Sequence, residues 1–160
     1  FVFSGDAGCA HPVLNREAVG RDAEALANQI GITVPPTTRL LIGETSKSHA
    51  FVQAEQMTSF VPFVRCTDVN QAIDQAIESE HGFRHTVIMH STDLNNLDRM
   101  ARLCDATIFV KNGASGAGVG SGGEGTLSYS IAGPTGEGIT TARTFTRRRR
   151  CALVDYFRIV

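Results

Sequence analysis

The stretch TVIMHSTDLNNLDRMARLCDATIFV, residues 86–110, decides the fold class of this chain. Its two ends, residues 86–89 and 107–110, are short apolar runs rich in β-branched residues, which is typical of buried strands. Between them, Thr92 or Asp93 begins a segment with apolar residues at helical spacing. These apolar residues are Leu94, Leu97, Met100, Ala101 and Cys104. The stretch therefore predicts strand, helix and strand in succession, the unit that builds parallel sheets.

The same alternation continues toward the N-terminus. Elements are expected as helix 15–30, strand 39–43, helical turns within 49–56, strand 60–65 and helix 69–77. Asn15 and Asp68 are the expected N-caps, and Gly31 is the expected stop of the first helix. Pro62 places its strand at a sheet edge or makes it a strand start. The pattern predicts an α/β fold with a mostly parallel sheet flanked by helices on both faces.

Length and composition describe one ordinary globular domain. The chain has 160 residues, 42% of them hydrophobic, and a net charge of −1, so no overall field attracts nucleic acid or membranes. No apolar run reaches the roughly 18 residues of a membrane helix. Four scattered cysteines without metal spacing indicate reduced thiols in the cytoplasm. Because the chain begins at Phe1 in strand-like sequence, we expect a fragment of a longer protein.

Residues 112–138 form a glycine- and serine-rich segment that is too long for an ordinary connection, interrupted by an expected strand at 126–131. Within it, residues 118–123 match G-x-G-x-x-G. A dinucleotide-binding motif must open a helix, whereas the residues that follow are strand-like and Glu124 would repel phosphate. We therefore expect a flexible or closely packed glycine loop.

The histidines and cysteines do not form a recognisable catalytic or metal site. The five histidines lack zinc-ligand spacing, so most are expected to be structural, with one lining a substrate pocket as the alternative. Cys9 lies two residues before His11, but this spacing and the lack of a third orienting group argue against a catalytic thiol. Cys66, Cys104 and Cys151 lie in or beside predicted core elements and are expected to be inert.

The C-terminal region combines a basic run with an apolar end. Residues 147–150 are four arginines, which could bind phosphates but are better explained as a charged edge that discourages strand pairing. Residues 152–160 are expected to form a terminal strand that pairs with a partner subunit. The domain organisation is then 1–150 for the main domain and 151–160 for an oligomerisation strand.

Several segments together resemble the C-terminal part of the CoA-acylating aldehyde dehydrogenases, of the propionaldehyde and acetaldehyde kind found in bacterial microcompartments. The matching segments are residues 39–45, 51–56, 61–65, 80–86, 88–91, 131–138 and 145–151. They occur in the family's order, and the last two form its closing signature.

The resemblance implies an enzyme that converts an aldehyde, CoA and NAD⁺ to acyl-CoA and NADH through a cysteine thioester. Glu55 matches the second Glu of the superfamily's Glu-Glu-x-Phe-Gly-Pro motif, which implies that it binds the nicotinamide ribose. The partners implied are a small aldehyde, CoA, the rest of the parent enzyme and further copies in a homo-oligomer. The implied location is the cytoplasm or the interior of a microcompartment, with no nucleic-acid or membrane partner.

This sequence departs from the family motif in two ways. Ala54 replaces the first Glu, and residues 57–59 read Met-Thr-Ser where Phe-Gly-Pro is common. The family's nucleophilic cysteine lies upstream of every matched segment, so we expect no catalytic residue in this chain and no activity of the chain alone. Two alternatives remain open, namely a stand-alone nucleotide-binding module and a structural or assembly domain without catalysis.

Overall fold

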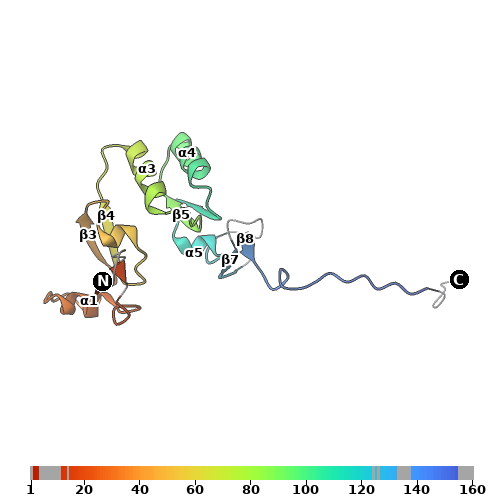
Figure 1. Ribbon diagram of the computed structural model, residues 1–160, viewed down its shortest axis with the longest axis horizontal. Helices are drawn as coiled ribbons and strands as arrows, with labels where there is room; N and C mark the ends of the chain where they lie inside the picture. The colour runs from red at the N-terminus through yellow and green to blue at the C-terminus, as the bar shows by residue number, and fades with distance from the viewer. Residues whose placement is uncertain are drawn as a thin grey trace. The chain divides into compact units, whose positions relative to one another are not determined.

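The computed structural model describes residues 2–3, 12–13, 15–123, 125, 127–132 and 138–154. The chain divides into two compact units, Phe1–Gly82 and Phe83–Val160 (Figure 1), where the sequence predicts one domain over residues 1–150. Cys9, His11 and residues 133–137 and 155–160, which the sequence analysis singles out, lie outside the described residues.

The first unit contains a parallel strand pair with three helices. Its elements are β1 (Val2–Phe3), β2 (Pro12–Val13), α1 (Ala23–Gln29), β3 (Leu41–Thr45), α2 (Ala50–Gln53), β4 (Phe60–Val64) and α3 (Val69–Ser79). β1 and β2 pair antiparallel. β3 and β4 pair parallel with Leu41 opposite Phe60 and Thr45 opposite Val64 (Figure 1).

Helix α1 is shorter than the sequence predicts, and the prediction of Asn15 as its N-cap is wrong. Residues 16–20 form turns, and Asn15 Oδ1 accepts a hydrogen bond from the Glu17 N–H at 3.0 Å. Gly20 then adopts a left-handed φ of 70°, which interrupts any helix. The true N-cap is Asp22, whose carboxylate accepts from the Ala25 N–H at 2.9 Å.

Pro62 is tolerated in the β3–β4 pair because both strands of a two-stranded sheet are edge strands. An edge strand can contain a residue that lacks a backbone N–H. Pro62 lies opposite Gly43, and a Cβ at Gly43 would lie 3.1 Å from Cζ of Phe60. Gly43 therefore leaves room for the Phe60 ring. Burial alternates along both strands, and the exposed positions are occupied by Ile42, Glu44, Val61 and Phe63.

An exposed ion pair joins the ends of these strands and permits a pH prediction. Arg65 donates two hydrogen bonds to the Glu44 carboxylate, at 2.9 and 2.8 Å. These bonds, and then the positive charge of Arg65, hold the pKa of Glu44 below its ordinary value of 4.5. Because the folded pKa is lowered, the pair stabilises the fold above that ordinary value and loses its effect as the pH falls through the lowered one.

We expect the Arg65→Gln variant to return the Glu44 pKa toward its ordinary value. The measurement is a carbon-13 NMR titration of the Glu44 carboxyl in both proteins. Superimposable titration curves would show that Arg65 does not hold the carboxylate in solution.

The second unit contains the strand, helix and strand predicted from residues 86–110. Its elements are β5 (Thr86–Met89), α4 (Leu94–Cys104), β6 (Ile108–Lys111), α5 (Ser115–Gly118), β7 (Ser130–Ala132) and β8 (Gly138–Thr140). β5 and β6 pair parallel, and β7 and β8 pair antiparallel (Figure 1). Asp93 caps α4 by accepting from the Asn95 N–H at 2.8 Å. The buried apolar residues here are Leu97, Met100, Cys104, Ile108 and Val110.

Parallel strands accompanied by helices in both units confirm the predicted α/β class. Asp68 caps α3 as predicted, accepting from the Gln71 N–H at 2.9 Å. In the described part of the chain, no helix is long and apolar enough to cross a membrane.

The glycine segment after β6 is closely packed at Gly118 and Gly123. Gly118 is the last residue of α5, so the G-x-G-x-x-G letters follow a helix instead of opening one. A Cβ at Gly118 would collide with Cγ2 of Ile108, and one at Gly123 would collide with the backbone of Ala117. These two glycines serve close packing, whereas Gly122 and Gly125 have open space around them. The position after a helix agrees with the rejection of a dinucleotide loop.

The C-terminal segment, residues 147–154, is exposed. The four arginines at 147–150 are all exposed, and residues 147–154 contain no strand. The expected terminal strand over 152–160 is therefore not seen in its described part, and its remainder lies beyond residue 154.

Candidate functional site

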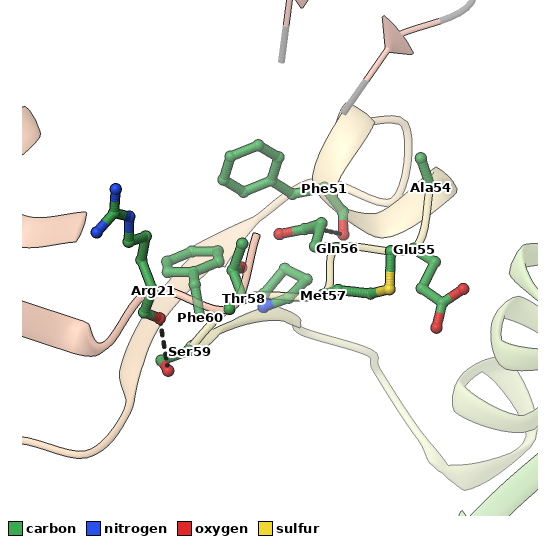
Figure 2. A pocket seen from close by; sticks show the side chains of 11 residues that line it. Arg21, Phe51, Ala54, Glu55, Gln56, Met57, Thr58, Ser59 and Phe60 are labelled. Atoms are coloured by element: carbon green, nitrogen blue, oxygen red, sulfur yellow. Dashed lines mark hydrogen bonds between the residues drawn. The ribbon is translucent and has the colours of Figure 1, made fainter. Parts of the chain in front are cut away.

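The cavity that contains Glu55 lies in the first unit and measures about 520 Å³ (Figure 2). It is lined by Gly20, Arg21, Phe51, Ala54, Glu55, Gln56, Met57, Thr58, Ser59, Phe60 and Pro62. Three parts of the chain contribute these residues: the turn before α1, helix α2 with the link that follows it, and the start of β4. The volume is within the usual range for small-molecule sites, roughly 300–1,000 Å³.

The link between α2 and β4, residues 54–59, forms much of the cavity wall. His49 begins α2, since its Nδ1 accepts from the Phe51 N–H at 3.1 Å. Ala54 ends the helix in an extended conformation, with φ −130° and ψ 140°. The Gln56 side chain then reaches back and donates to the Phe51 carbonyl. Glu55 is therefore carried on an extended segment directly after a short helix.

Two hydrogen bonds join this link to the turn before α1. The Gly20 N–H donates to the Met57 carbonyl at 2.9 Å, and Ser59 Oγ donates to the Arg21 carbonyl at 3.1 Å. The Leu41 N–H also donates to the Ser59 carbonyl at 2.9 Å, which connects the link to β3. These bonds fix the spacing between the two walls of the cavity.

Aromatic rings form the interior side of the site. Phe51 and Phe60 meet edge to face with ring centroids 5.3 Å apart, and His49 meets Phe51 in the same manner at 5.2 Å. This geometry is favourable for aromatic pairs and holds the Phe51 ring in place. A neighbouring cavity of about 300 Å³ shares Phe51 and Phe60 and extends toward Leu26 and Ile30 of the α1 region.

Glu55 lies at the exposed rim, and its carboxylate points away from the phenyl rings (Figure 2). An exposed carboxylate can accept hydrogen bonds from two neighbouring hydroxyls of a ligand. Met57 lines the same cavity and is 58% exposed, so its thioether offers an apolar surface. The structure thus places Glu55, the candidate for cofactor binding, and Met57 in the lining of one cavity.

Three of the four described histidines, His49, His81 and His85, have local structural partners. His49 caps α2, His81 Nε2 bonds to the Gln53 carbonyl at 3.1 Å, and His85 Nδ1 bonds to Thr86 Oγ1 at 2.7 Å. Among the described residues, no three His, Cys, Asp or Glu side chains come together as a metal site would require. The predicted structural role of these histidines therefore agrees with the contacts.

The cysteines differ from one another in burial. Cys104 is buried in α4, and Cys66 is half-buried, with its thiol 3.8 Å from the Val64 carbonyl. Cys151 is exposed, so the prediction that it lies in or beside the core is wrong. Its neighbours at 147–154 form no described strand that could cover it.

Sequence reasoning missed Arg21 and Gly20 as parts of the site. Arg21 precedes the N-cap of α1 and reaches the cavity only because the turn is bonded to residues 57–59. The only local signal was Gly20, whose left-handed conformation ends the turn beside the link.

No family model matches this chain. Among curated proteins, it is 50% identical over 147 residues to the acetaldehyde dehydrogenase (acetylating) EutE of Salmonella typhimurium, covering 92% of this chain and 32% of the relative. It is 44% identical over 148 residues to the propanal dehydrogenase (CoA-propanoylating) of Citrobacter freundii, with coverage of 92% and 32%. The chain thus spans about a third of the length of these relatives.

Solved structures give the same result. A Rhodopseudomonas palustris propionaldehyde dehydrogenase with bound propionyl-CoA matches with a TM-score of 0.80 and 50% identity, over 88% of this chain and 32% of that one. An engineered glycolyl-CoA reductase with bound NADP⁺ matches equally well, over 88% and 33%. A propionaldehyde dehydrogenase from a Clostridium phytofermentans microcompartment for fucose utilisation has a TM-score of 0.80 and 42% identity, over 88% and 32%. The predicted resemblance to CoA-acylating aldehyde dehydrogenases is confirmed.

Proposed function

We propose that this chain is the C-terminal part of a CoA-acylating aldehyde dehydrogenase. The whole enzyme would convert a short aldehyde such as acetaldehyde or propionaldehyde, with CoA and NAD⁺, to acyl-CoA and NADH. The observation that carries the proposal is the 50% identity over 147 residues to an acetylating acetaldehyde dehydrogenase. The coverage of 32% of that relative supports a fragment, and the nucleophilic cysteine would lie in the remaining part of the enzyme.

The side chains that line the cavity around Glu55 suit the chemical groups of a nicotinamide nucleotide. A carboxylate at the rim suits ribose hydroxyls, and Met57 with the Phe51 and Phe60 rings offers apolar surface to a planar base. NAD⁺, when bound, supplies the acceptor for the hydride of the aldehyde. Glu55 would accept hydrogen bonds from the two ribose hydroxyls and so orient the nucleotide. The hydrogen bonds of residues 57–59 would keep that carboxylate in place.

The remaining features of the proposal concern assembly and location. Residues 1–150 would be part of the catalytic domain, and residues 151–160 would form a strand that pairs with another subunit in a homo-oligomer. The exposed apolar side chains of Leu153 and Val154 support this, because a partner would remove them from water. The protein would lie in the cytoplasm. The alternative, the interior of a bacterial microcompartment, is supported by the similar structure from a fucose-utilisation microcompartment.

The test is an activity assay of the full-length protein that contains this chain. With propanal, CoA and NAD⁺, we expect continuous NADH formation by absorbance and propionyl-CoA by mass spectrometry. When CoA is omitted, we expect no propionyl-CoA and no NADH beyond one equivalent per active site. Formation of the free acid in place of the thioester would overturn the CoA-acylating assignment.

The 160-residue chain alone is expected to form no acyl-CoA under the same conditions, because it lacks the proposed nucleophile. Calorimetry of the chain with NAD⁺ and with CoA tests the alternative of a stand-alone binding module. Turnover that depends on Cys9 would contradict the fragment proposal.

A further inference from the structure

Arg21 and Glu55 line the same cavity from two segments that are distant in the sequence. Figure 2 places Arg21 at one end of the cavity and Glu55 at the other, with Met57, Thr58 and Ser59 between them. The cavity therefore has a cationic end and an anionic end. A ligand that carries both hydroxyls and a negative charge matches this arrangement better than a neutral one.

The backbone of Arg21 is held in position by the opposite wall. Ser59 Oγ donates to its carbonyl at 3.1 Å, and the N–H of the preceding Gly20 donates to Met57 O at 2.9 Å. Asp22, which follows, caps α1. The start of the arginine side chain is thus fixed relative to the segment that carries Glu55.

Among the described residues, the guanidinium of Arg21 makes a hydrogen bond through one nitrogen, its Nε. The acceptor of this bond is the Glu17 carbonyl, at 3.1 Å, so the bond does not use the two terminal nitrogens. Three of the other exposed arginines bind carboxylates, namely Arg65 with Glu44, Arg84 with Asp105 and Arg102 with Asp98. None of the ion pairs among the described residues involves Arg21. Its planar pair of donors suits a phosphate group, which can accept two parallel hydrogen bonds.

The proposed cofactor carries groups that suit both the Arg21 end and the Glu55 end of the cavity. In a nicotinamide dinucleotide the nicotinamide ribose is esterified directly to the diphosphate, so a carboxylate on the ribose hydroxyls brings a phosphate within a few bonds. We infer that Arg21 contacts the cofactor phosphate next to the ribose that Glu55 holds. This inference rests on the proposed function and adds a second, charged contact to the same site.

The test separates the phosphate contact from a merely structural role by comparing two ligands. Nicotinamide mononucleotide carries the phosphate, and nicotinamide riboside is the same molecule without it. Binding of both, and of NADH, is measured by calorimetry to the full-length protein and to its Arg21→Gln variant. We expect the variant to bind the mononucleotide and NADH about tenfold more weakly, while its affinity for the riboside changes by less than about twofold.

The matched control is Arg16→Gln, which removes the same charge from the same turn. Arg16 is exposed and does not line the cavity, so all three affinities should stay unchanged. Equal weakening of mononucleotide and riboside in Arg21→Gln would assign Arg21 a structural role and overturn the inference. If the NADH affinity is unchanged in Arg21→Gln but weakened in Glu55→Gln, the inference about Arg21 is wrong and the proposed function stands. Failure of the unaltered protein to bind NADH would overturn the proposed function as well.

Discussion

The Glu55→Gln variant of the full-length protein is expected to raise the KM for NAD⁺ about 10–100-fold. The substitution removes the charge and one acceptor oxygen while keeping the size of the side chain. Hydrogen bonds from hydroxyls to a charged acceptor are each worth about 1.5–3 kcal/mol, so their weakening dominates any change in shape. Glu55 is exposed at the cavity rim, and its replacement should leave the fold intact.

The measurement is the initial rate of NADH formation over a range of NAD⁺ and propanal concentrations. We expect the KM for propanal to change by less than about twofold, because Glu55 is assigned to the nucleotide and not to the aldehyde. The control is Glu24→Gln, which removes a carboxylate from α1 in the same unit without lining the cavity. Equal KM values for NAD⁺ in Glu55→Gln and the unaltered protein would exclude Glu55 from cofactor binding.

Sequence reasoning succeeded where several local signals coincide within one short stretch. In residues 86–110, β-branched runs, a capping aspartate and helical spacing all indicate the same elements. The structure places β5, α4 and β6 there, with Asp93 as the cap. The same agreement holds for Asp68 and α3. Each signal acts over a few residues, so no long-range contact is needed to read it.

The prediction for α1 failed because two signals competed and the backbone decided between them. Asn15 is a good capping residue, and apolar spacing continued after it, so a long helix was expected. The left-handed Gly20 cannot continue a helix, and Asp22 starts a shorter one beyond it. The conformation of a glycine is not visible in apolar spacing, which explains the error.

The site could be predicted only in part for a related reason. Glu55 is a candidate because of its resemblance to a motif, and a motif describes residues that are close in sequence. The opposite wall, with Gly20 and Arg21, is joined to residues 57–59 by tertiary hydrogen bonds. Such bonds depend on how two segments meet in space, and no periodicity in either segment reveals them.

The Gly118→Ala variant of the full-length protein is expected to destabilise the β5–β6 region by about 1–3 kcal/mol. A Cβ at this position would collide with Cγ2 of Ile108 and would lie 3.0 Å from Cγ2 of Val110. Both neighbours are buried on β6, and a β-branched side chain has little freedom to turn away. The added methyl must therefore move α5 away from the strand or displace the strand itself.

Gly116→Ala in the same short helix is the matched control. The nearest atom to a Cβ at Gly116 is Cβ of Ser121 at 3.8 Å, an ordinary contact, so this alanine gains helix propensity without a clash. Amide hydrogen exchange of residues 108–111 reports the local stability of β6 directly. We expect exchange to accelerate about 5–150-fold in Gly118→Ala, the rate equivalent of 1–3 kcal/mol, and to stay the same or slow down in Gly116→Ala. Equal exchange in the two variants would mean that α5 does not pack against β6 as closely in solution, because only the collision distinguishes the two glycines.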